Sequence, residues 1–215
     1  MESSSPAECA DRLATAVSTA LAHTLALGRP ASLVVSGGST PLPFFHALRD
    51  RVLPWARVSV LLADERQVPP DHRDSNERLV REHLLTAGHA ASAATWIPLL
   101  EDAIRPLLPF TAVVLGMGAD GHTASLFPEA PDRDTLLDPE GTALVAPVTP
   151  SIAPHPRLTL TLAALAQSRA RFLHITGADK RSVFDAAIAS STAGTARLPI
   201  ARVHAAAPLQ VFWSP

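Results

Sequence analysis

A glycine-rich turn that carries an aspartate and a histidine lies near the middle of the chain. Residues 116–128 read GMGADGHTASLFP and directly follow the apolar run 111–115, so a strand is expected to lead into the turn. Three glycines in six residues would let a ligand approach the backbone closely, and Asp120 and His122 place titratable groups beside it. Histidine commonly acts as a general base that a carboxylate orients. The turn is a candidate catalytic site, and tight strand-to-helix packing is the alternative interpretation.

A second turn offers groups that bind anions. Residues 36–41 read SGGSTP and follow the apolar run 32–35, which is typical of a strand buried on both faces of a parallel sheet. We expect Thr40 to cap the next helix, with Pro41 as its first residue. Backbone amides and hydroxyls would then converge where a helix dipole favours a phosphate. A capped helix start without a ligand is the alternative, because Thr-Pro caps are common.

Charged residues mark two further places. Asp64, Glu65 and Arg66 come shortly after the apolar run 58–62. Ligands of open parallel sheets bind outside the carboxyl ends of the strands, so these side chains are candidates for substrate contacts. A solvated turn with internal ion pairs is the alternative. Arg157 begins an alternating stretch and could either reach an anion or pair with a carboxylate.

Lysine occurs once in this chain. Of the 18 basic residues, 17 are arginines and one is Lys180. This residue stands in the first turn of a predicted helix, shortly after the apolar run 171–175. A cation there opposes the helix dipole, so the position is unfavourable unless the ammonium reaches an anionic ligand. Lys180 is therefore a candidate phosphate contact, and the chance survival of one lysine is the competing explanation.

Helices and strands that alternate along the chain must position these residues. Apolar runs typical of buried strands are separated by stretches whose apolar residues recur at helical spacing. This alternation predicts an α/β fold in three layers, α/β/α, around a mostly parallel, doubly wound sheet. Right-handed crossovers would gather the carboxyl ends of the strands at one edge. Residues 132–141 are expected to form a loop, and residues 86–109 give no clear prediction. The strands are predicted at residues 32–35, 58–62, 111–115, 143–145, 171–175 and 209–212.

Length and composition narrow the function classes. A chain of 215 residues is expected to form a single domain, residues 1–215. The net charge of −2 offers no basic surface for nucleic acid, and no apolar run approaches the roughly 20 residues of a membrane span. One cysteine, Cys9, excludes an internal disulfide and favours a reducing, cytoplasmic location. Histidines, cysteines and carboxylates show no metal-ligand spacing, so we expect a small anionic partner and no metal.

The ordered set of motifs resembles the glucosamine-6-phosphate isomerase/6-phosphogluconolactonase family over nearly the whole chain. Deaminases of this family carry a glutamate five residues after the histidine, whereas Phe127 stands there in this chain, so the resemblance implies the lactone-hydrolysing branch. Residues 86–109 are shorter than the family pattern, which puts in doubt the helix that the pattern places there. The resemblance rests on residues 36–41, 64–66, 74–76, 116–128, 156–161, 177–180 and 198–199.

The resemblance implies hydrolysis of 6-phospho-D-glucono-1,5-lactone in the pentose phosphate pathway, without a cofactor and by a monomer or weak homodimer. His122 would be the general base for a water that attacks the lactone carbonyl, and Asp120 would orient the imidazole or contact a sugar hydroxyl. Main-chain amides of the glycine turns would hold the oxyanion. The substrate-binding residues implied are Gly37, Gly38, Ser39, Thr40, Asp64, Arg66, Asn76, Gly118, Gly121, Arg157 and Lys180.

Two other functions stay open at this stage. A sugar-phosphate isomerase or deaminase would release ammonia from glucosamine 6-phosphate, and it would need another carboxylate, such as Glu129, in place of the missing glutamate. A non-catalytic sugar-phosphate sensor would carry a DNA-binding helix-turn-helix ahead of the domain. The first predicted strand begins at residue 32, which leaves little room for such a module.

Overall fold

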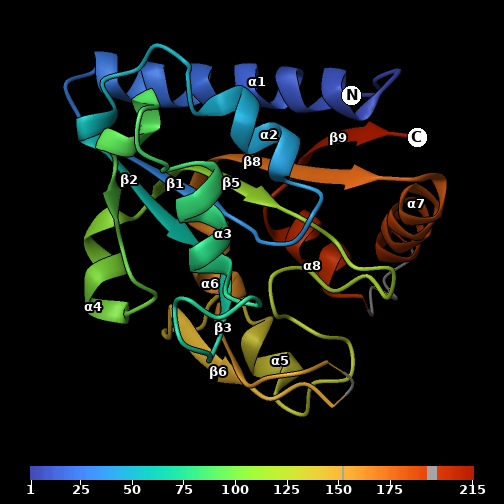
Figure 1. Ribbon diagram of the computed structural model, residues 1–215. Coiled ribbons are helices and arrows are strands. Elements are labelled where there is room, and N and C mark those ends of the chain that lie inside the picture. Colours follow the sequence, from blue (N-terminus) through green and yellow to red (C-terminus); the bar gives the residue numbers. More distant parts are fainter. Residues whose placement is uncertain (152, 193–197) are drawn as a thin grey trace.

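Two β-sheets form the framework of the protein, whose computed structural model describes residues 1–151, 153–192 and 198–215 (Figure 1). Every neighbouring pair of strands in the larger sheet is parallel. The two central strands, β1 (Ala31–Val35) and β5 (Phe110–Leu115), are buried along their whole length, which confirms that helices cover both faces of the sheet. In spatial order the strands are β4 (Thr95–Trp96), β2 (Val58–Leu62), β1 (Ala31–Val35), β5 (Phe110–Leu115), β8 (Ser168–Thr176) and β9 (Gln210–Ser214).

The smaller sheet is antiparallel and lies beyond the carboxyl ends of the larger one. It consists of β3 (Asp64–Arg66), β7 (Arg157–Leu160) and β6 (Val145–Val148), with β7 in the middle. β3 begins two residues after β2 ends, so the chain passes directly from one sheet into the other. The register pairs Arg66 with Arg157. This pairing brings two cations from distant parts of the sequence to one place.

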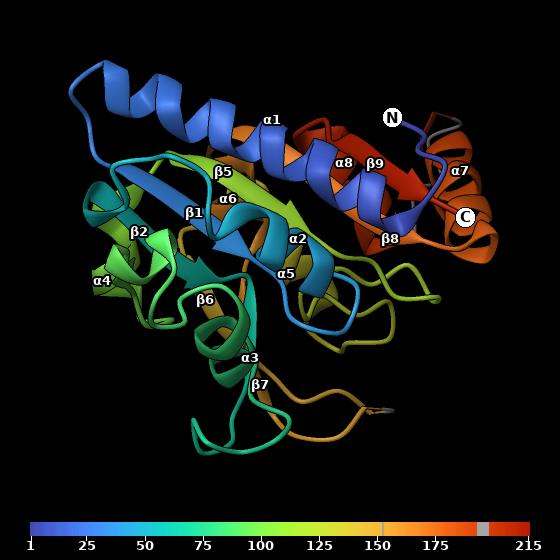
Figure 2. The same ribbon diagram turned by 45° about the horizontal axis from the view of Figure 1, so that its top comes forward.

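Helices cover the larger sheet on both sides. Figures 1 and 2 show α1 and α2 over one face, and Figure 1 shows α6 and α8 beneath the other. The three-layer α/β/α prediction is therefore confirmed. No helix in the described parts of the chain has the length and apolar character needed to cross a membrane. The α-helices are α1 (Pro6–Ala26), α2 (Leu42–Leu48), α3 (Asn76–His83), α4 (Glu101–Ile104), α5 (Arg133–Leu136), α6 (Leu162–Ala166), α7 (Ala178–Thr192) and α8 (Pro199–Ala206).

The first helix is capped at its amino end and buried along one face. Ser5 Oγ accepts a hydrogen bond from the Glu8 amide at 3.2 Å, and Glu8 in turn accepts one from the Ser4 amide at 2.8 Å. The first bond satisfies an amide of the first helical turn, and the second fastens the residue before the N-cap to that turn. The apolar face, which includes Leu13, Val17 and Leu21, is fully buried against the sheet and α2.

Three local expectations were wrong. Thr40 does not cap α2, which begins at Leu42 with Pro41 in the N-cap position and no side-chain cap. Residues 132–141 are not all loop, because α5 forms a single helical turn there, too short to leave a periodic pattern. The strand expected at residues 143–145 begins only at Val145. The unassigned segment 86–109 contains β4, α4 and two 3₁₀ turns, η2 (Ala90–Ala93) and η3 (Arg105–Leu107), and a further 3₁₀ turn, η1 (Trp55–Arg57), precedes β2.

Candidate active site

A cavity of about 300 Å³ lies at the carboxyl ends of the parallel strands. Its wall includes the last residues of β1 and β5, Val35 and Leu115. The rule that ligands bind at this edge of a parallel sheet predicted the place correctly. The cavity gathers most of the candidate residues from the sequence, namely Gly37, Gly38, Ser39, Thr40, Asp64, Arg66, Asn76, Gly118, His122, Arg157 and Lys180.

His122 and Asp120 form a hydrogen-bonded pair. The imidazole Nδ1 lies 2.6 Å from Asp120 Oδ1, and the same oxygen accepts a bond from the His122 amide at 3.2 Å. A carboxylate on Nδ1 favours the tautomer with its proton there, which leaves Nε2 as the basic nitrogen. Asp120 is not among the described residues that line the cavity. Its position fits orientation of the imidazole better than contact with a sugar hydroxyl.

The backbone of the turn is held by its own hydrogen bonds. The Gly118 amide donates to the His122 carbonyl at 2.9 Å, and the Gly121 amide donates to the Gly118 carbonyl at 3.1 Å. These two amides already have partners within the turn, and the expectation that amides of the glycine turns hold the oxyanion stays a prediction. Gly121 also lies outside the described cavity wall, with φ at +79° and Leu198 2.8 Å from where a β-carbon would be. This position fits a conformational role, and the substrate contact expected of Gly121 stays a prediction.

Phe127 packs against His122, the candidate catalytic residue. Its ring centroid lies 4.7 Å from that of the His122 imidazole, and the Arg157 guanidinium carbon lies 5.4 Å from the same ring. The phenylalanine is buried. Its ring thus contacts both an imidazole and a guanidinium, by an aromatic and a cation–π interaction that each favour one orientation. Glu129, the alternative carboxylate, lines a much smaller separate cavity of about 10 Å³.

Arg157 and Asp64 form a buried ion pair at the cavity wall. Arg157 Nη1 lies 3.8 Å from Asp64 Oδ2, which also accepts a bond from Ser125 Oγ at 2.6 Å. Burial lowers the pKa of Arg157, while the nearby Asp64 carboxylate acts in the opposite direction. Arg157 Nε is buried and has no hydrogen-bond partner in the described structure. The expected pairing of Arg157 with a carboxylate is confirmed, and because Arg157 also lines the cavity, its contact with an anion stays a prediction.

Arg66 supplies a second guanidinium to the same wall. Its Nη1 donates to the Asp74 carbonyl at 2.6 Å, whereas its buried Nε has no partner among the described residues. Two arginines that line one cavity are well suited to an anion. Asn76 connects two parts of the cavity wall. Its Nδ2 donates to the Asp64 carbonyl at 2.9 Å, and its side chain fills the space that a β-carbon on Gly37 would need.

The sequence analysis missed two residues that build this site, Ser125 and His174, and it gave a third, Glu65, a different role. Glu65 was a candidate for substrate contact, but it does not line the cavity in the described structure. It accepts bonds from Ser75 Oγ at 3.0 Å and from the amides at the start of α3, so it locks that helix onto β3. Ser125 was noticed only as part of a motif, although it holds Asp64. His174, hidden in the apolar run of β8, lines the cavity. A polar residue within such a run is the one signal that could have found it.

His174 and Lys180 stand on the side of the cavity formed by β8 and α7. Burial lowers the pKa of His174 to about 4, and the positive charge of Lys180 acts in the same direction. The imidazole is therefore neutral at pH 7, and its Nδ1 has no partner within the described residues. Lys180 lies in the first turn of α7, as predicted, and lines the cavity. On this side of the cavity, Lys180 therefore carries the positive charge and His174 does not.

Comparison with known proteins places the chain in one family. The sequence profile described as glucosamine-6-phosphate isomerases/6-phosphogluconolactonase matches residues 4–213. The 6-phosphogluconolactonase of Pseudomonas aeruginosa is 43% identical over an alignment that covers 98% of this chain and 92% of that protein. That of Mesorhizobium japonicum is 44% identical, covering 94% and 90%. The solved structure of a 6-phosphogluconolactonase from Shewanella baltica matches with a TM-score of 0.88 at 38% identity, covering 100% of this chain and 96% of that one.

Proposed function

The chain belongs to the glucosamine-6-phosphate isomerase/6-phosphogluconolactonase family, and we propose that it is a hydrolase that converts 6-phospho-D-glucono-1,5-lactone to 6-phospho-D-gluconate in the pentose phosphate pathway. The observation that carries this proposal is one cavity that combines the Asp120-oriented His122 with Arg66, Arg157 and Lys180. A base beside a cluster of cations suits a phosphorylated substrate that reacts with water. Relatives named for this activity match the chain over at least 90% of their length.

His122 is the proposed general base. Its Nε2 takes a proton from a water molecule as the water oxygen attacks C1 of the lactone, and the carbonyl oxygen becomes an oxyanion. When the tetrahedral intermediate collapses, the bond between C1 and the ring oxygen breaks, and the imidazolium returns the proton to that oxygen. Positioned proton transfer of this kind typically contributes about 10²- to 10⁴-fold to the rate. Asp120 stabilises the imidazolium that forms between the two steps.

Arg66, Arg157 and Lys180 are the proposed phosphate ligands, together with the turn at residues 37–40. A phosphate dianion accepts charge-assisted hydrogen bonds from guanidinium and ammonium groups. Arg66 and Arg157 both line the cavity, so their guanidinium groups can offer such bonds. The Thr40 hydroxyl is not used to cap α2, so it is free of that role and lines the cavity.

Asp64 is proposed to bind hydroxyls of the sugar ring. One of its oxygens, Oδ2, is engaged by Ser125 and faces Arg157. The second oxygen remains as an acceptor for a sugar hydroxyl. Because Asn76 and Ser125 fix the backbone and the side chain of Asp64, the acceptor is held in place before the substrate binds.

An assay with three substrates tests this function. We expect lactone hydrolysis above the spontaneous rate with 6-phosphogluconolactone, a much lower kcat/KM with unphosphorylated gluconolactone, and no ammonia from glucosamine 6-phosphate. Ammonia release would instead identify a deaminase, and binding without turnover of any substrate would identify a sensor. Equal rates with the phosphorylated and unphosphorylated lactones would contradict the assignment of the three cations to the phosphate.

The cellular location and the oligomeric state of the enzyme are also proposals. Cys9 is buried on the core face of α1, where a thiol packs as a small apolar group, and this fits a reducing, cytoplasmic location. We propose a monomer or a weak homodimer. Sedimentation equilibrium over a hundredfold range of protein concentration should show a mass near that of one chain at the lowest concentration. A higher mass that persists at this concentration would exclude both a monomer and a weak homodimer.

A further inference from the structure

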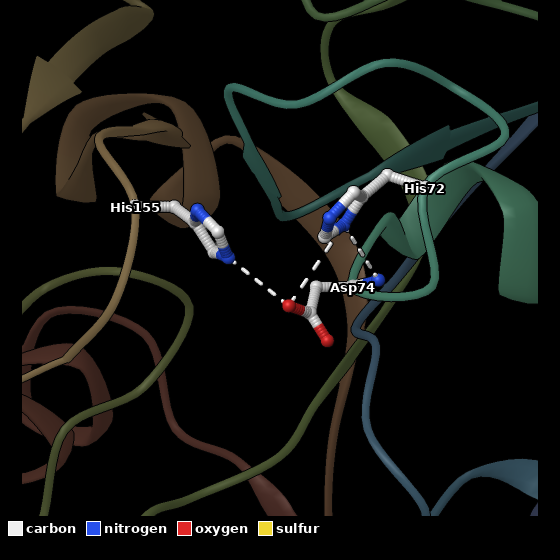
Figure 3. Close-up of side chains that lie close together, drawn as sticks. All are labelled: His72, Asp74 and His155. Atoms are coloured by element: carbon white, nitrogen blue, oxygen red, sulfur yellow. Dashed lines mark hydrogen bonds and ion pairs between the residues drawn. The ribbon is translucent and has the colours of Figure 1, made fainter.

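A group of metal-ligating side chains lies outside the cavity. His72, Asp74 and His155 each place one ligand atom within 4.8 Å of those of the other two, and no other group of three or more was found in the described residues. Figure 3 shows the two imidazoles on either side of the carboxylate. His155 is 81 residues from Asp74 in the sequence, which is why the spacing of residues gave no sign of the group. We call these three side chains the His-Asp-His cluster.

We propose that the His-Asp-His cluster is a binding site for a divalent transition-metal ion, of which Zn²⁺ is the representative. Two imidazoles and one carboxylate are a ligand set that zinc accepts, with remaining positions open to water. The cluster belongs to two loops, and the ion would join them. This role is separate from the proposed lactone hydrolysis, because none of the three side chains lines the cavity in the described structure.

The distances fit a common ion. His155 Nε2 lies 3.0 Å from Asp74 Oδ2, and His72 Nδ1 lies 3.8 Å from the same oxygen. Ligand atoms bound to one tetrahedral zinc at about 2.0–2.1 Å are roughly 3.3 Å from each other. The two observed separations lie on either side of that value, so small side-chain rotations would complete the site. The cation would replace the hydrogen bond between His155 Nε2 and Asp74 Oδ2.

The cluster also offers an acceptor nitrogen to a cation. His72 Nδ1 accepts a hydrogen bond from the Asp74 amide at 3.1 Å (Figure 3), so this nitrogen carries a lone pair, and a cation bound there would replace that hydrogen bond. Each of the three side chains is between 29% and 37% exposed, so an ion can enter from solvent.

The backbone of His155 is unusual. Its φ angle is +69°, a left-handed conformation that favours glycine. Histidine adopts this conformation more readily than most residues, and here it turns the imidazole of His155 toward Asp74. The ion would hold together the loop that follows β3 and the loop that precedes β7. Both loops adjoin arginines of the cavity, because Arg66 donates to the Asp74 carbonyl and His155 stands two residues before Arg157.

The test is metal binding by the whole protein after removal of metals with EDTA. Isothermal titration with Zn²⁺ should show one saturable equivalent, Co²⁺ should give the visible absorption of a low-coordinate site, and Zn²⁺ should raise the Tm. His155→Gly removes the imidazole and also relieves the left-handed backbone, so this variant is expected to fold. It should lower the Zn²⁺ affinity at least tenfold and abolish the Tm shift, and His72→Ala should do the same.

A matched control comes from another pair of imidazoles. His46 Nε2 and His83 Nδ1 lie 3.2 Å apart without a third ligand in the described structure. The double variant His46→Ala/His83→Ala should bind Zn²⁺ as the wild type does. Absence of saturable binding by the wild type, unchanged affinity in His155→Gly, or loss of binding only in the control variant would each overturn the proposal.

Discussion

No side chain fits at Gly118, because a β-carbon there would lie 2.3 Å from both Nδ1 and Cε1 of the His122 imidazole. The same β-carbon would lie 2.6 Å from Asp120 Oδ1. These distances are far inside van der Waals contact, so the paired imidazole and carboxylate occupy the space that the missing side chain leaves. The glycine is therefore a condition for the His122–Asp120 pair, and not only a flexible turn residue.

Gly118→Ala should displace that pair. Because the imidazole and the carboxylate must move to admit the methyl group, kcat should fall about 100-fold or more, as for loss of a positioned base. Steady-state lactone hydrolysis measures the effect, and circular dichroism verifies the fold. Gly141→Ala is the control, since it lies outside the cavity wall and meets no atom closer than 3.2 Å. A folded Gly118→Ala enzyme with wild-type kcat would contradict this role.

Phe127→Leu should loosen the imidazole. The substitution keeps an apolar side chain but removes the flat ring that contacts both His122 and Arg157. Aromatic and cation–π contacts of this type each contribute about 0.5–1.5 kcal/mol, so we expect kcat to fall about threefold to tenfold. Phe127→Tyr retains the ring and should stay close to wild type. The idea fails if leucine and tyrosine give the same kcat.

Lys180→Ala should affect the phosphorylated substrate alone. A hydrogen bond to a charged group contributes about 1.5–3 kcal/mol, so KM for 6-phosphogluconolactone should rise about tenfold to 100-fold. Kinetics with unphosphorylated gluconolactone should not change. Arg181→Ala removes the next cation along α7, which pairs with Asp185, and should leave both substrates unaffected. An equal loss with both lactones would exclude a phosphate contact.

His174→Asn should flatten the loss of stability in acid. The pKa of His174 is about 4 in the folded protein and near its ordinary value of 6.5 when unfolded, so between these values the unfolded state binds the extra proton. Stability is therefore lost as the pH falls through this window. Between pH 7.5 and 5.0 the wild type should lose about 2 kcal/mol more than the variant. Urea unfolding at both pH values measures this, and parallel losses would refute it.

Much of the site could be predicted because it depends on local rules. Apolar runs identified the central strands, and the carboxyl-end rule then placed the turn at residues 36–41, Asp64 and His122 at one edge. The failures have two physical origins. Contacts between distant residues leave no local signal, as for Ser125 and Asp64, 61 residues apart. The prediction that Thr40 caps α2 failed for another reason, because a Thr-Pro pair does not reveal whether the helix begins at the proline or after it.

The most direct measurement is the rate of 6-phosphogluconolactone hydrolysis by His122→Asn, corrected for spontaneous hydrolysis. Asparagine keeps much of the size and polarity of the imidazole but cannot accept a proton from water. We expect kcat to fall about 10²- to 10⁴-fold, with KM nearly unchanged because the phosphate ligands remain. A variant that hydrolyses the lactone as fast as the wild type would show that His122 is not the base.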